Sequence, residues 1–189
     1  FGKMMRIEAG GFCSAWSLMF LHLCLLWKPT CLDDAKIEFY SKNYSIMVNC
    51  IYSKDNNWKN LDFKNISKEN LLININNCAY NSLWYPILFA KMLTKYKRKG
   101  SIINLSSIYG LLAQDENIYK NSNIKENIVY NYNKSGLINF TRALASRYAK
   151  HGIRSNVICP GGIRDKTNKL QSTNFLNNYS KRVPIGRLA

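Results

Sequence analysis

Two side chains that could share a proton stand four residues apart in the segment 129–150. Tyr130 carries a phenol and Lys134 an ammonium, and a four-residue step places both on one face of a helix. The positive charge favours the phenolate form, so we expect it to lower the tyrosine pKa toward neutrality. The pair is a candidate for general acid–base catalysis. A solvated helix end is the alternative, because a chain with 12 tyrosines produces such pairs by chance.

The residues around this pair have the period of a helix. Leu137, Phe140, Leu144 and Tyr148 recur at steps of three and four residues. Alanines between them allow close packing against a neighbouring element. Residues 129–150 are therefore predicted to form one packed helix, with the Tyr/Lys pair near its start.

An apolar strand is predicted on each side of this helix. Residues 101–105 come before it and are followed by Ser106 and Ser107. Residues 154–159 come after it and end at the turn 160–163, which contains two glycines. Such a turn lets backbone groups approach a flat ring closely.

This order of motifs resembles the C-terminal catalytic half of the short-chain dehydrogenase/reductase family, which has a Rossmann fold and uses NAD or NADP. The resemblance implies an α/β protein with a Rossmann-like, doubly wound parallel sheet in three αβα layers. Residues 33–189 would form this domain, with the catalytic half at 71–189, after an atypical apolar segment at 1–32. Since the chain begins at Phe1 and stops after VPIGRLA, we interpret it as a fragment that is incomplete at both ends.

The resemblance assigns roles to individual residues. Tyr130 would be the general acid/base on a carbonyl or alcohol, and Ser107 would hold the substrate oxygen. Lys134 would lower the tyrosine pKa and bind the nicotinamide ribose, so Tyr130 and Lys134 both also belong to the cofactor site. The nicotinamide carboxamide would lie against the turn that contains Pro160, Gly161 and Ile163.

Two asparagines complete the predicted site. Residues 71–75 are predicted to be a strand, followed by NNCA at 76–79. Asn77 matches the family's asparagine that stabilises the central sheet and faces the cofactor ribose; an ordinary Asn-rich turn is the alternative. A helix is expected at 80–99, and Asn81 near its start is the candidate for the family's catalytic asparagine.

The part of the chain that should bind the dinucleotide departs from the family pattern. Residues 33–55 are predicted to contain a helix and then a strand at 45–51, which resemble the first helix and second strand of a dinucleotide-binding half. The Gly-rich phosphate loop would then precede Asp33, but LLWKPTCL contains no glycine, and Gly10 and Gly11 lie too far upstream. We therefore expect no saturable micromolar binding of NADH or NADPH by this chain. A catalytically impaired homologue is the alternative to an active enzyme.

Residues 12–27 are almost entirely apolar. Their length is short for a membrane span and suits the core of a signal peptide, with Lys3 and Arg6 as the positive flank. Glu8 and the absence of a small-residue cleavage site oppose this interpretation, so a buried helix or a damaged stretch of sequence is the alternative. The six cysteines include no Cys-x-x-Cys pair, so we expect no metal site and a cytoplasmic, reducing location.

The net charge of +16 raises the possibility of nucleic-acid or anionic-membrane binding. Lysine and asparagine are abundant throughout the chain, and no basic run is interleaved with aromatic residues in a recognisable nucleic-acid motif. We therefore expect no specific nucleic-acid partner and no membrane. A basic membrane-associated or nucleic-acid-binding protein is kept as a third hypothesis.

The resulting hypothesis is an NAD(P)-dependent oxidoreductase of carbonyl or alcohol compounds that forms a homo-oligomer when full length. Ser107 and Tyr130 are 23 positions apart, a longer spacing than is usual in the family. A similar lengthened loop occurs in a branch linked to bacterial surface-sugar and flagellin modification, which suggests a sugar derivative as substrate. The choice between NAD and NADP stays open, because Lys54 and Asp55 have opposite implications.

Overall fold

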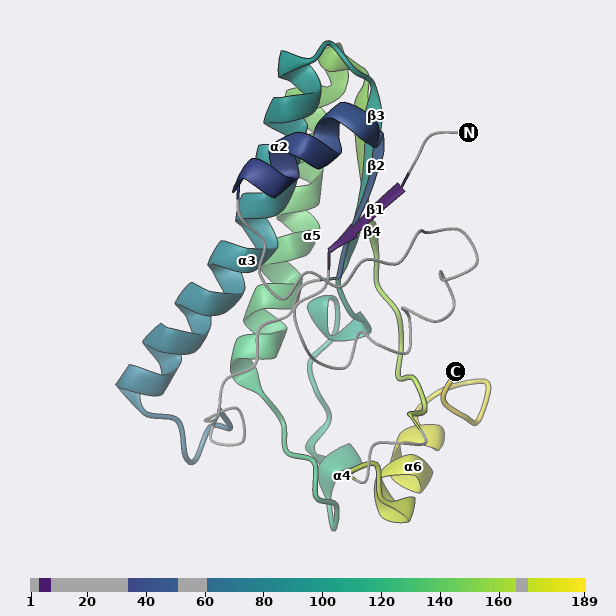
Figure 1. Ribbon diagram of the computed structural model, residues 1–189. Coiled ribbons are helices and arrows are strands. Elements are labelled where there is room, and N and C mark those ends of the chain that lie inside the picture. The colour runs from purple at the N-terminus through teal and green to yellow at the C-terminus, as the bar shows by residue number, and fades with distance from the viewer. Residues whose placement is uncertain (1–3, 8–33, 51–60, 166–169) are drawn as a thin grey trace.

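The centre of the molecule is a sheet of four parallel strands in the order β1-β2-β3-β4 (Figure 1). The computed structural model describes residues 4–7, 34–50, 61–165 and 170–189. The strands are β1 (Met4–Ile7), β2 (Ile46–Asn49), β3 (Gly100–Leu105) and β4 (Ile153–Ile158). The predicted parallel α/β fold is confirmed, and β3 and β4 agree with the predicted strands to within one residue at each end.

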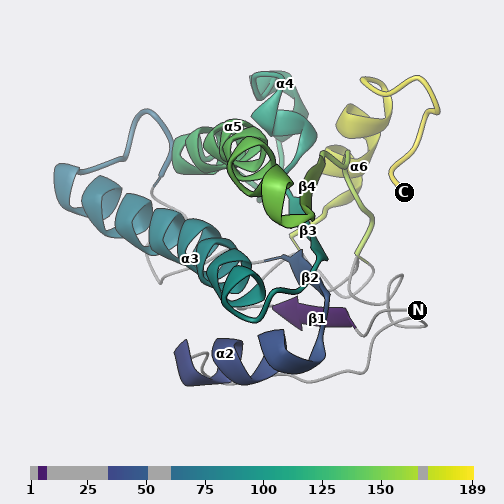
Figure 2. The ribbon, with the colours of Figure 1, turned by 90° about the horizontal axis from the view of Figure 1, so that it is seen from above.

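Helices form the crossovers that parallel strands require. The long ones are α2 (Asp34–Asn43), α3 (Lys68–Lys95) and α5 (Ile128–Tyr148), which lie together on one face of the sheet (Figure 2). The short elements are η2 (Ile108–Gly110), α4 (Glu116–Tyr119), η3 (Ala149–His151) and α6 (Thr173–Ser180). Of these, α4 and α6 lie beyond the carboxyl ends of β3 and β4 (Figure 1).

The main hydrophobic core lies between the sheet and these helices. Met47, Ile102 and Ile153 of the strands pack with Phe89 and Leu93 of α3, and all five are almost fully buried. Apolar burial of this kind is the dominant favourable contribution to folding. Helix α5 packs against the same sheet through β4.

The prediction of a strand at residues 71–75 is wrong, because α3 already begins at Lys68. The alternation of isoleucine and asparagine in ININN imitates a strand. The buried residues of α3 nevertheless follow the helical period over its whole length, and the helix begins at the N-cap Ser67, whose hydroxyl accepts from the Asn70 amide. Asn77 is exposed on this helix, and Asn81 lies in its middle and not near its start.

The interpretation of residues 45–51 as the second strand of a dinucleotide-binding half is also wrong in its position. In the doubly wound order 3-2-1-4-5-6, the second strand adjoins only the first and the third strands. Here β2 pairs directly with β3, with Asn49 opposite Asn104. Asn49 therefore takes the place beside the serine strand that the sequence analysis gave to Asn77.

Some predictions concern residues outside the described part of the chain. The apolar segment 12–27 and the expected phosphate loop before Asp33 both lie there. Within the segment 1–32 the structure describes β1, which the sequence analysis did not predict. Across the described residues, every helix is too short or too polar to cross a membrane.

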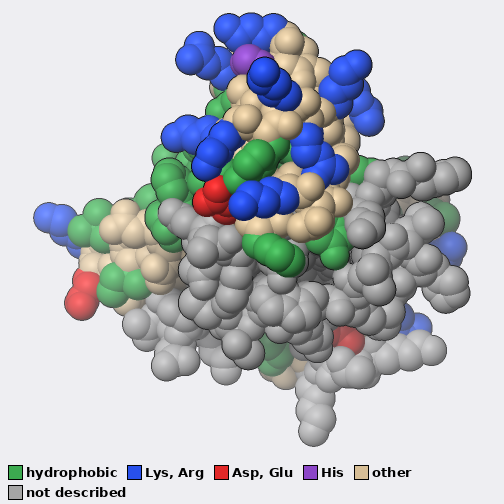
Figure 3. Space-filling model, turned by 45° about the horizontal axis from the view of Figure 1, so that its top comes forward, with side chains coloured by type: hydrophobic (Ala, Val, Ile, Leu, Met, Phe, Trp, Pro, Cys, Tyr) green, Lys and Arg blue, Asp and Glu red, His purple; other side chains and the backbone are tan. Residues whose placement is uncertain are grey.

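Basic side chains gather over the end of the molecule where the strands begin (Figure 3). The exposed ones at this end are Lys42, Lys95, Lys97, Lys99, Arg147, Lys150 and Arg154. They come from the last turns of α2, α3 and α5, from the loop that leads into β3, from η3 and from the start of β4. The high positive charge of the chain is thus concentrated, in part, at the amino end of the sheet and away from the carboxyl end, where α4 and α6 lie.

Candidate active site

Helix α5 presents Tyr130 and Lys134 from its first two turns. Asn127 is the N-cap, and its Oδ1 accepts the amide of Tyr130 at 2.9 Å. Lys134 is only 2% exposed, and its Nζ donates to the carbonyl of Leu105, the last residue of β3, at 2.7 Å. The same Nζ lies 5.6 Å from the centre of the Tyr130 ring. The predicted pair therefore exists, and a buried hydrogen bond to the end of the central strand fixes its ammonium.

The two serines after β3 have different roles. Ser106 is buried and donates from Oγ to the carbonyl of Lys134 at 2.7 Å, which joins the end of β3 to α5. Ser107 is the N-cap of η2, and its Oγ accepts the amide of Tyr109 at 3.2 Å. A Cβ at Gly110 would lie 2.8 Å from the carbonyl of Lys134, so the contact between η2 and α5 requires a glycine.

The turn after β4 closes over the end of β3. The amide of Ile108 donates to the carbonyl of Pro160 at 2.9 Å. The amide of Gly162 donates to Oη of Tyr179 in α6 at 2.6 Å. An added Cβ at Gly162 would lie 2.6 Å from Cζ of Tyr179, so the phenol ring can rest on this turn only because the residue is glycine. Neither Gly162 nor Tyr179 was among the predicted site residues.

One cavity at the carboxyl edge of the sheet brings together most of the predicted site. Its wall includes Ser107, Tyr130, Lys134, Pro160, Gly161 and Ile163. Asn77 and Asn81 are not in this wall. On α3, Nδ2 of Asn81 donates to the carbonyl of Asn77 at 2.8 Å. The roles suggested for these two asparagines stay predictions that no contact of the described residues supports.

The far wall of the cavity comes from the lengthened loop and from α6, and none of its residues was among the predicted site residues. The long loop between η2 and α5 contributes Gln114, Tyr119 and Ile124, and α6 contributes Phe175 and Tyr179. These segments form an apolar cluster with Ile118 and Leu188. Asp115 is the N-cap of α4, and its carboxylate accepts a hydrogen bond at 2.6 Å from Nε of Arg182, which follows α6 in the chain. The lengthened loop is thus a structured wall of the site.

Three tyrosine hydroxyls of this wall stay protonated at neutral pH. Burial raises the pKa of Tyr119 to about 12. Burial also raises the pKa values of Tyr109 and Tyr179 above their ordinary value. These three phenol groups are therefore neutral and can donate or accept hydrogen bonds.

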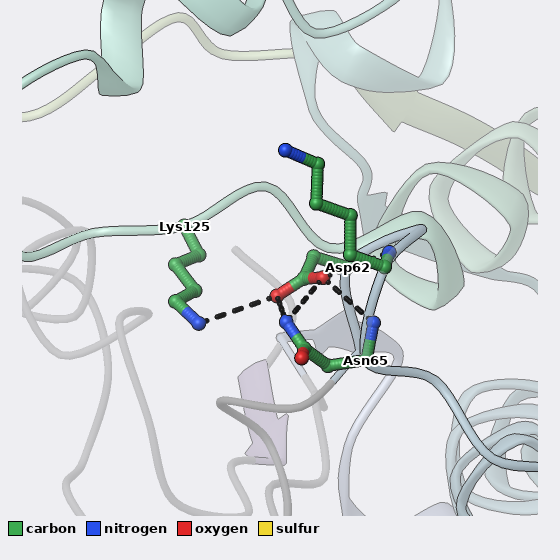
Figure 4. A network of polar contacts seen from close by, with 4 residues as sticks. Asp62, Asn65 and Lys125 are labelled. Carbon is green, nitrogen blue, oxygen red and sulfur yellow. Dashed lines mark hydrogen bonds and ion pairs between the residues drawn. The ribbon is translucent and has the colours of Figure 1, made fainter.

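An ion pair ties the long loop to the segment before α3 (Figure 4). Lys125, which lines the cavity, places Nζ 3.5 Å from Oδ2 of Asp62. Asp62 also accepts from the amides of Lys64 and Asn65, each at 3.0 Å, and from the Asn65 side chain at 2.8 Å. These hydrogen bonds hold the pKa of the Asp62 carboxyl below its usual range, and the bond from the Asn65 side chain has the largest effect. The amide of Ile128 donates to the carbonyl of Leu61 at 3.1 Å, so the start of α5 is tied to the same segment.

A network of buried polar side chains joins β2 and β3 to α3 and α5 next to the site. Nδ2 of Asn49 donates to Oδ1 of Asn104 at 2.9 Å and to the carbonyl of Ser82 at 3.0 Å. Nδ2 of Asn104 donates to Oγ1 of Thr141 on α5 at 2.9 Å. Oγ of Ser82 donates to Oδ1 of Asn133, the neighbour of Lys134, at 3.1 Å. The signal that could have revealed this network is an asparagine inside each of two apolar strands, IMVN and IINL.

These groups suit proton transfer to an oxygen bound in the cavity. A hydroxyl, a phenol and a buried ammonium line the same cavity. Within the described ranges, no group of three His, Cys, Asp or Glu side chains is placed to hold a metal ion.

Comparisons with known proteins agree with this arrangement. A family model described as Enoyl-(Acyl carrier protein) reductase matches residues 35–189. A 3-oxoacyl-[acyl-carrier-protein] reductase from Bos taurus is 34% identical over 130 residues, which make up 65% of this chain and 49% of that protein. Post-translational flagellin modification protein A from Campylobacter coli is 30% identical over 154 residues, 80% of this chain and 57% of that protein. The chain spans about half the length of these curated relatives.

Solved structures share the fold. A short-chain dehydrogenase from Leptospira borgpetersenii, crystallised with NAD+, superposes with a TM-score of 0.78 and 25% identity, covering 100% of this chain and 80% of that one. A gluconate 5-dehydrogenase from Burkholderia cenocepacia, in complex with NADP and tartrate, gives a TM-score of 0.64 at 17% identity. That match covers 83% of this chain and 59% of the other, and it supports the fold alone.

Proposed function

Since the chain belongs to the short-chain dehydrogenase/reductase family, we propose that it transfers hydride between NAD or NADP and a carbonyl or alcohol substrate, with Tyr130 as the general acid/base. The observation that carries the proposal is the single cavity that Ser107, Tyr130, Lys134 and the turn 160–163 share. These groups come from three separate segments of the chain, which meet at the carboxyl edge of the sheet. Ligands of open α/β sheets bind at this edge.

In the direction of reduction, the side chains would act on one oxygen atom. Oγ of Ser107 accepts from the Tyr109 amide, so its own hydrogen can be donated to the substrate oxygen. The phenol of Tyr130 would give its proton to that oxygen as negative charge develops there. The ammonium of Lys134, fixed by the Leu105 carbonyl, would stabilise the phenolate that is left. The cofactor, when bound, supplies the hydride.

The described residues fit the nicotinamide end of the cofactor. Lys134 and the turn 160–163 border the cavity, and a Cβ at Gly161 would have only the Tyr179 hydroxyl near it, at 3.7 Å, so this part of the turn is open. The expected position of the phosphate loop changes with the observed fold. Since β1 ends at Ile7, a loop after the first described strand would begin there, and Gly10 and Gly11 follow it in sequence.

For the substrate we propose a small carbonyl or alcohol compound with an apolar portion. The walls include Ile124, Ile163 and Phe175 as well as the neutral phenols of Tyr119 and Tyr179. A 3-oxoacyl group and an oxidised sugar derivative are both compatible with such walls. The relatives named for 3-oxoacyl reduction and for flagellin modification suggest these two classes.

A catalytically impaired homologue is the second candidate. The observation that favours it is the absence of glycine between Gly11 and Gly100, which leaves at most two glycines for a phosphate loop. Titration of the chain with NADH or NADPH at about 0.15 M salt, read by fluorescence, separates the candidates. A micromolar isotherm that survives high salt supports the enzyme, and the absence of saturation supports the impaired homologue.

The experiment that tests the proposed mechanism compares two tyrosines of one helix. Tyr130→Phe removes the phenol from the cavity, and Tyr132→Phe makes the same change at a side chain that is 66% exposed. We expect Tyr130→Phe to lower kcat of carbonyl reduction by about 10²–10⁴-fold, because proton transfer is lost while the volume is kept. Tyr132→Phe should match the wild type. Equal activity of Tyr130→Phe and Tyr132→Phe would overturn the assignment.

Self-association and location are further parts of the proposal. Helices α3 and α5 expose Leu72, Tyr80 and Tyr132, each more than half accessible in the single chain. Exposed apolar side chains on two adjacent helices suit an interface between subunits. The homo-oligomer and the cytoplasmic location stay predictions, which light scattering and cell fractionation would test.

A further inference from the structure

The basic side chains at the amino end of the sheet form a surface that the proposed function does not use (Figure 3). They come from the ends of α2, α3 and α5, from the loop before β3, from η3 and from the start of β4. We call these exposed basic residues the amino-end patch. The catalytic cavity lies at the carboxyl edge of the sheet, so a partner bound to the amino-end patch would leave the cavity accessible.

The amino-end patch carries charge of almost one sign. Among the described residues, Glu38 is the one carboxylate at this end, and Nζ of Lys95 lies 2.9 Å from it. Other described carboxylates are at the opposite end of the molecule. Examples are Glu69 in the first turn of α3, the N-cap Asp115 of α4, and Glu126 just before α5. Positive charge is therefore concentrated at the amino end without a matching number of carboxylates.

The dipoles of the helices explain only part of the amino-end patch. A helix C-terminus carries partial negative charge, so a cation in the last turn is favourable, and the effect fades within that turn. The cations in last turns of the long helices are Lys42, Lys95 and Arg147. Lys97 and Lys99 follow the C-cap of α3, and Arg154 lies in β4. These three cations lie outside the helices and extend the surface beyond what the helix ends require.

The loop before β3 and the segment before β4 bring their cations together. The amide of Gly100 donates to the carbonyl of Gly152 at 3.3 Å. A Cβ at Gly152 would lie 2.8 Å from Cγ of Lys99, so the stem of the Lys99 side chain rests on this glycine. Lys150 and Arg154 are the second neighbours of Gly152 in the chain. Lys99, Lys150 and Arg154 therefore belong to one surface, although Lys99 is far from the other two in the sequence.

The composition of this surface fits a phosphate backbone better than a protein or a lipid bilayer. Protein interfaces and membrane-bound helices bury large apolar side chains. Apart from Phe39 of α2, the exposed large apolar side chains of the described residues belong to segments outside the amino-end patch. Tyr96 and Tyr148, at the ends of α3 and α5, are half-buried, so the patch offers charge and not a platform for stacked bases.

We propose that the amino-end patch binds the phosphodiester backbone of a single nucleic-acid strand, without regard to its base sequence. Lysine and arginine side chains bind such a backbone by releasing its condensed counterions. A flexible strand can follow a surface built from loops and helix ends, whereas a duplex groove is filled by a projecting helix or ribbon. The proposal does not depend on the oxidoreductase activity. It is compatible with a sequence that has no recognisable nucleic-acid motif, because it involves no base recognition.

The test compares two triple variants that remove the same charge. The patch triple carries Lys97→Gln, Lys99→Gln and Lys150→Gln. The control triple carries Lys64→Gln, Lys68→Gln and Lys120→Gln, at lysines that are also exposed but lie outside the amino-end patch. None of the six lysines lines the catalytic cavity. Thermal unfolding shows that both triples are folded before binding is measured.

The probe is a fluorescein-labelled oligouridylate of about 20 nucleotides, and fluorescence anisotropy gives its Kd between about 0.05 and 0.2 M salt. We expect the patch triple to raise Kd at about 0.1 M salt by about tenfold. It should also reduce the slope of log Kd against log salt by about 2, because each lost phosphate contact removes about 0.7 for a single strand. The control triple should change Kd by less than about threefold.

The other outcomes would overturn the proposal. If both triples weaken binding equally, net charge alone attracts the strand. A wild-type chain that does not bind oligouridylate at about 0.05 M salt has no such site. Oligocytidylate of the same length should bind within about threefold of oligouridylate, and a preference above about tenfold would mean base recognition. If vesicles with about 30% phosphatidylserine bind the wild type more tightly than the strand, and the patch triple loses this binding, the partner is an anionic membrane.

Discussion

The two ends of the sheet contain the same kinds of polar residue in opposite environments. At the amino end, Lys150 and Asn43 are exposed, and Glu38 is bound by the exposed Lys95 and by Tyr96. At the carboxyl end, Lys134 and Asn104 are almost fully inaccessible to solvent. Each of these buried groups is bound to the backbone or to another buried side chain.

The difference shows where polar residues do chemical work in this fold. An exposed lysine or carboxylate is solvated in both the folded and unfolded states, so a surface ion pair adds little stability. A buried lysine or carboxylate loses its hydration on folding, so neighbouring protein groups must bind it, and these partners also fix its position. The carboxyl end therefore contains rigid reactive groups. The amino end mainly contributes charge.

The largest expected effect comes from the same substitution at two lysines. Lys134→Met removes the buried ammonium and leaves the Leu105 carbonyl without this donor, while the side-chain volume is nearly kept. We expect kcat/KM for carbonyl reduction to fall by about 10²–10⁴-fold. Lys150→Met, at an exposed position of the amino end, should leave steady-state kinetics at the wild-type value.

The same two variants also show what result would contradict the prediction. If Lys134→Met and Lys150→Met have equal kcat/KM, the buried ammonium has no part in the reaction. Thermal unfolding of both variants shows whether a loss of activity is only a loss of folded protein.

A smaller effect, on stability, is expected from two asparagines. Asn104→Ala breaks the hydrogen bonds to Asn49 and Thr141 inside the protein. We expect the free energy of unfolding to fall by about 2–4 kcal/mol, since buried groups lose their partners. Asn43→Ala removes an exposed bond to the Phe39 carbonyl and should change it by less than about 0.5 kcal/mol.

Urea denaturation measures both values. If Asn43→Ala lowers the free energy of unfolding as much as Asn104→Ala does, the two ends of the sheet do not differ in the burial of their polar groups.

The smallest effect is a difference in pH dependence between two carboxylates. The pKa of Asp62 is lowered mainly by the Asn65 side chain, and that of Glu38 by the Tyr96 hydroxyl and Lys95. A lowered folded-state pKa stabilises the protein above the unfolded value, 3.8 for Asp62, and this contribution is lost as the pH falls through the folded value. Asp62→Asn should therefore flatten the decline of Tm between pH 5 and pH 2.

Glu38→Gln should follow the wild-type curve closely, because solvent screens the exposed pair. Salt would reduce its remaining effect further. The comparison fails if Glu38→Gln flattens the curve more than Asp62→Asn does.

The part of the chain from β3 to β4 was predictable because its signals are local. The step from Tyr130 to Lys134 and the apolar period of α5 lie within one helix, and the serines directly follow a short apolar strand. The parallel sheet then brings the ends of neighbouring strands to one edge. Six predicted site residues consequently line one cavity.

The first half of the described chain was misread because its asparagines occur in both helices and strands. Asn77 was placed after a strand that is in fact part of α3, and the residue beside the serine strand is Asn49. Only the pairing of β2 with β3 identifies that position, and strand order is a long-range property that a single sequence does not specify.

The individual residues of the far wall could not be named from the sequence for a related reason. Gln114 and Tyr119 belong to a polar loop, and Phe175 and Tyr179 to a short helix more than fifty residues later. Their contacts depend on how the two segments pack against each other. The N-cap role of Asn127 could have been read from an asparagine just before an apolar helical run.

The apolar cluster of the long loop and α6 has a consequence for access to the cavity. Ile118, Phe175, Tyr179 and Leu188 pack mainly with one another, apart from the main core between the sheet and α3. Such a satellite cluster opens at a lower free energy than the sheet does, as a unit of its own. Separation of the long loop from α6 would expose the cavity, while the Tyr130–Lys134 pair stays in place. In the proposed reaction, the product would leave through this opening without disturbing the pair.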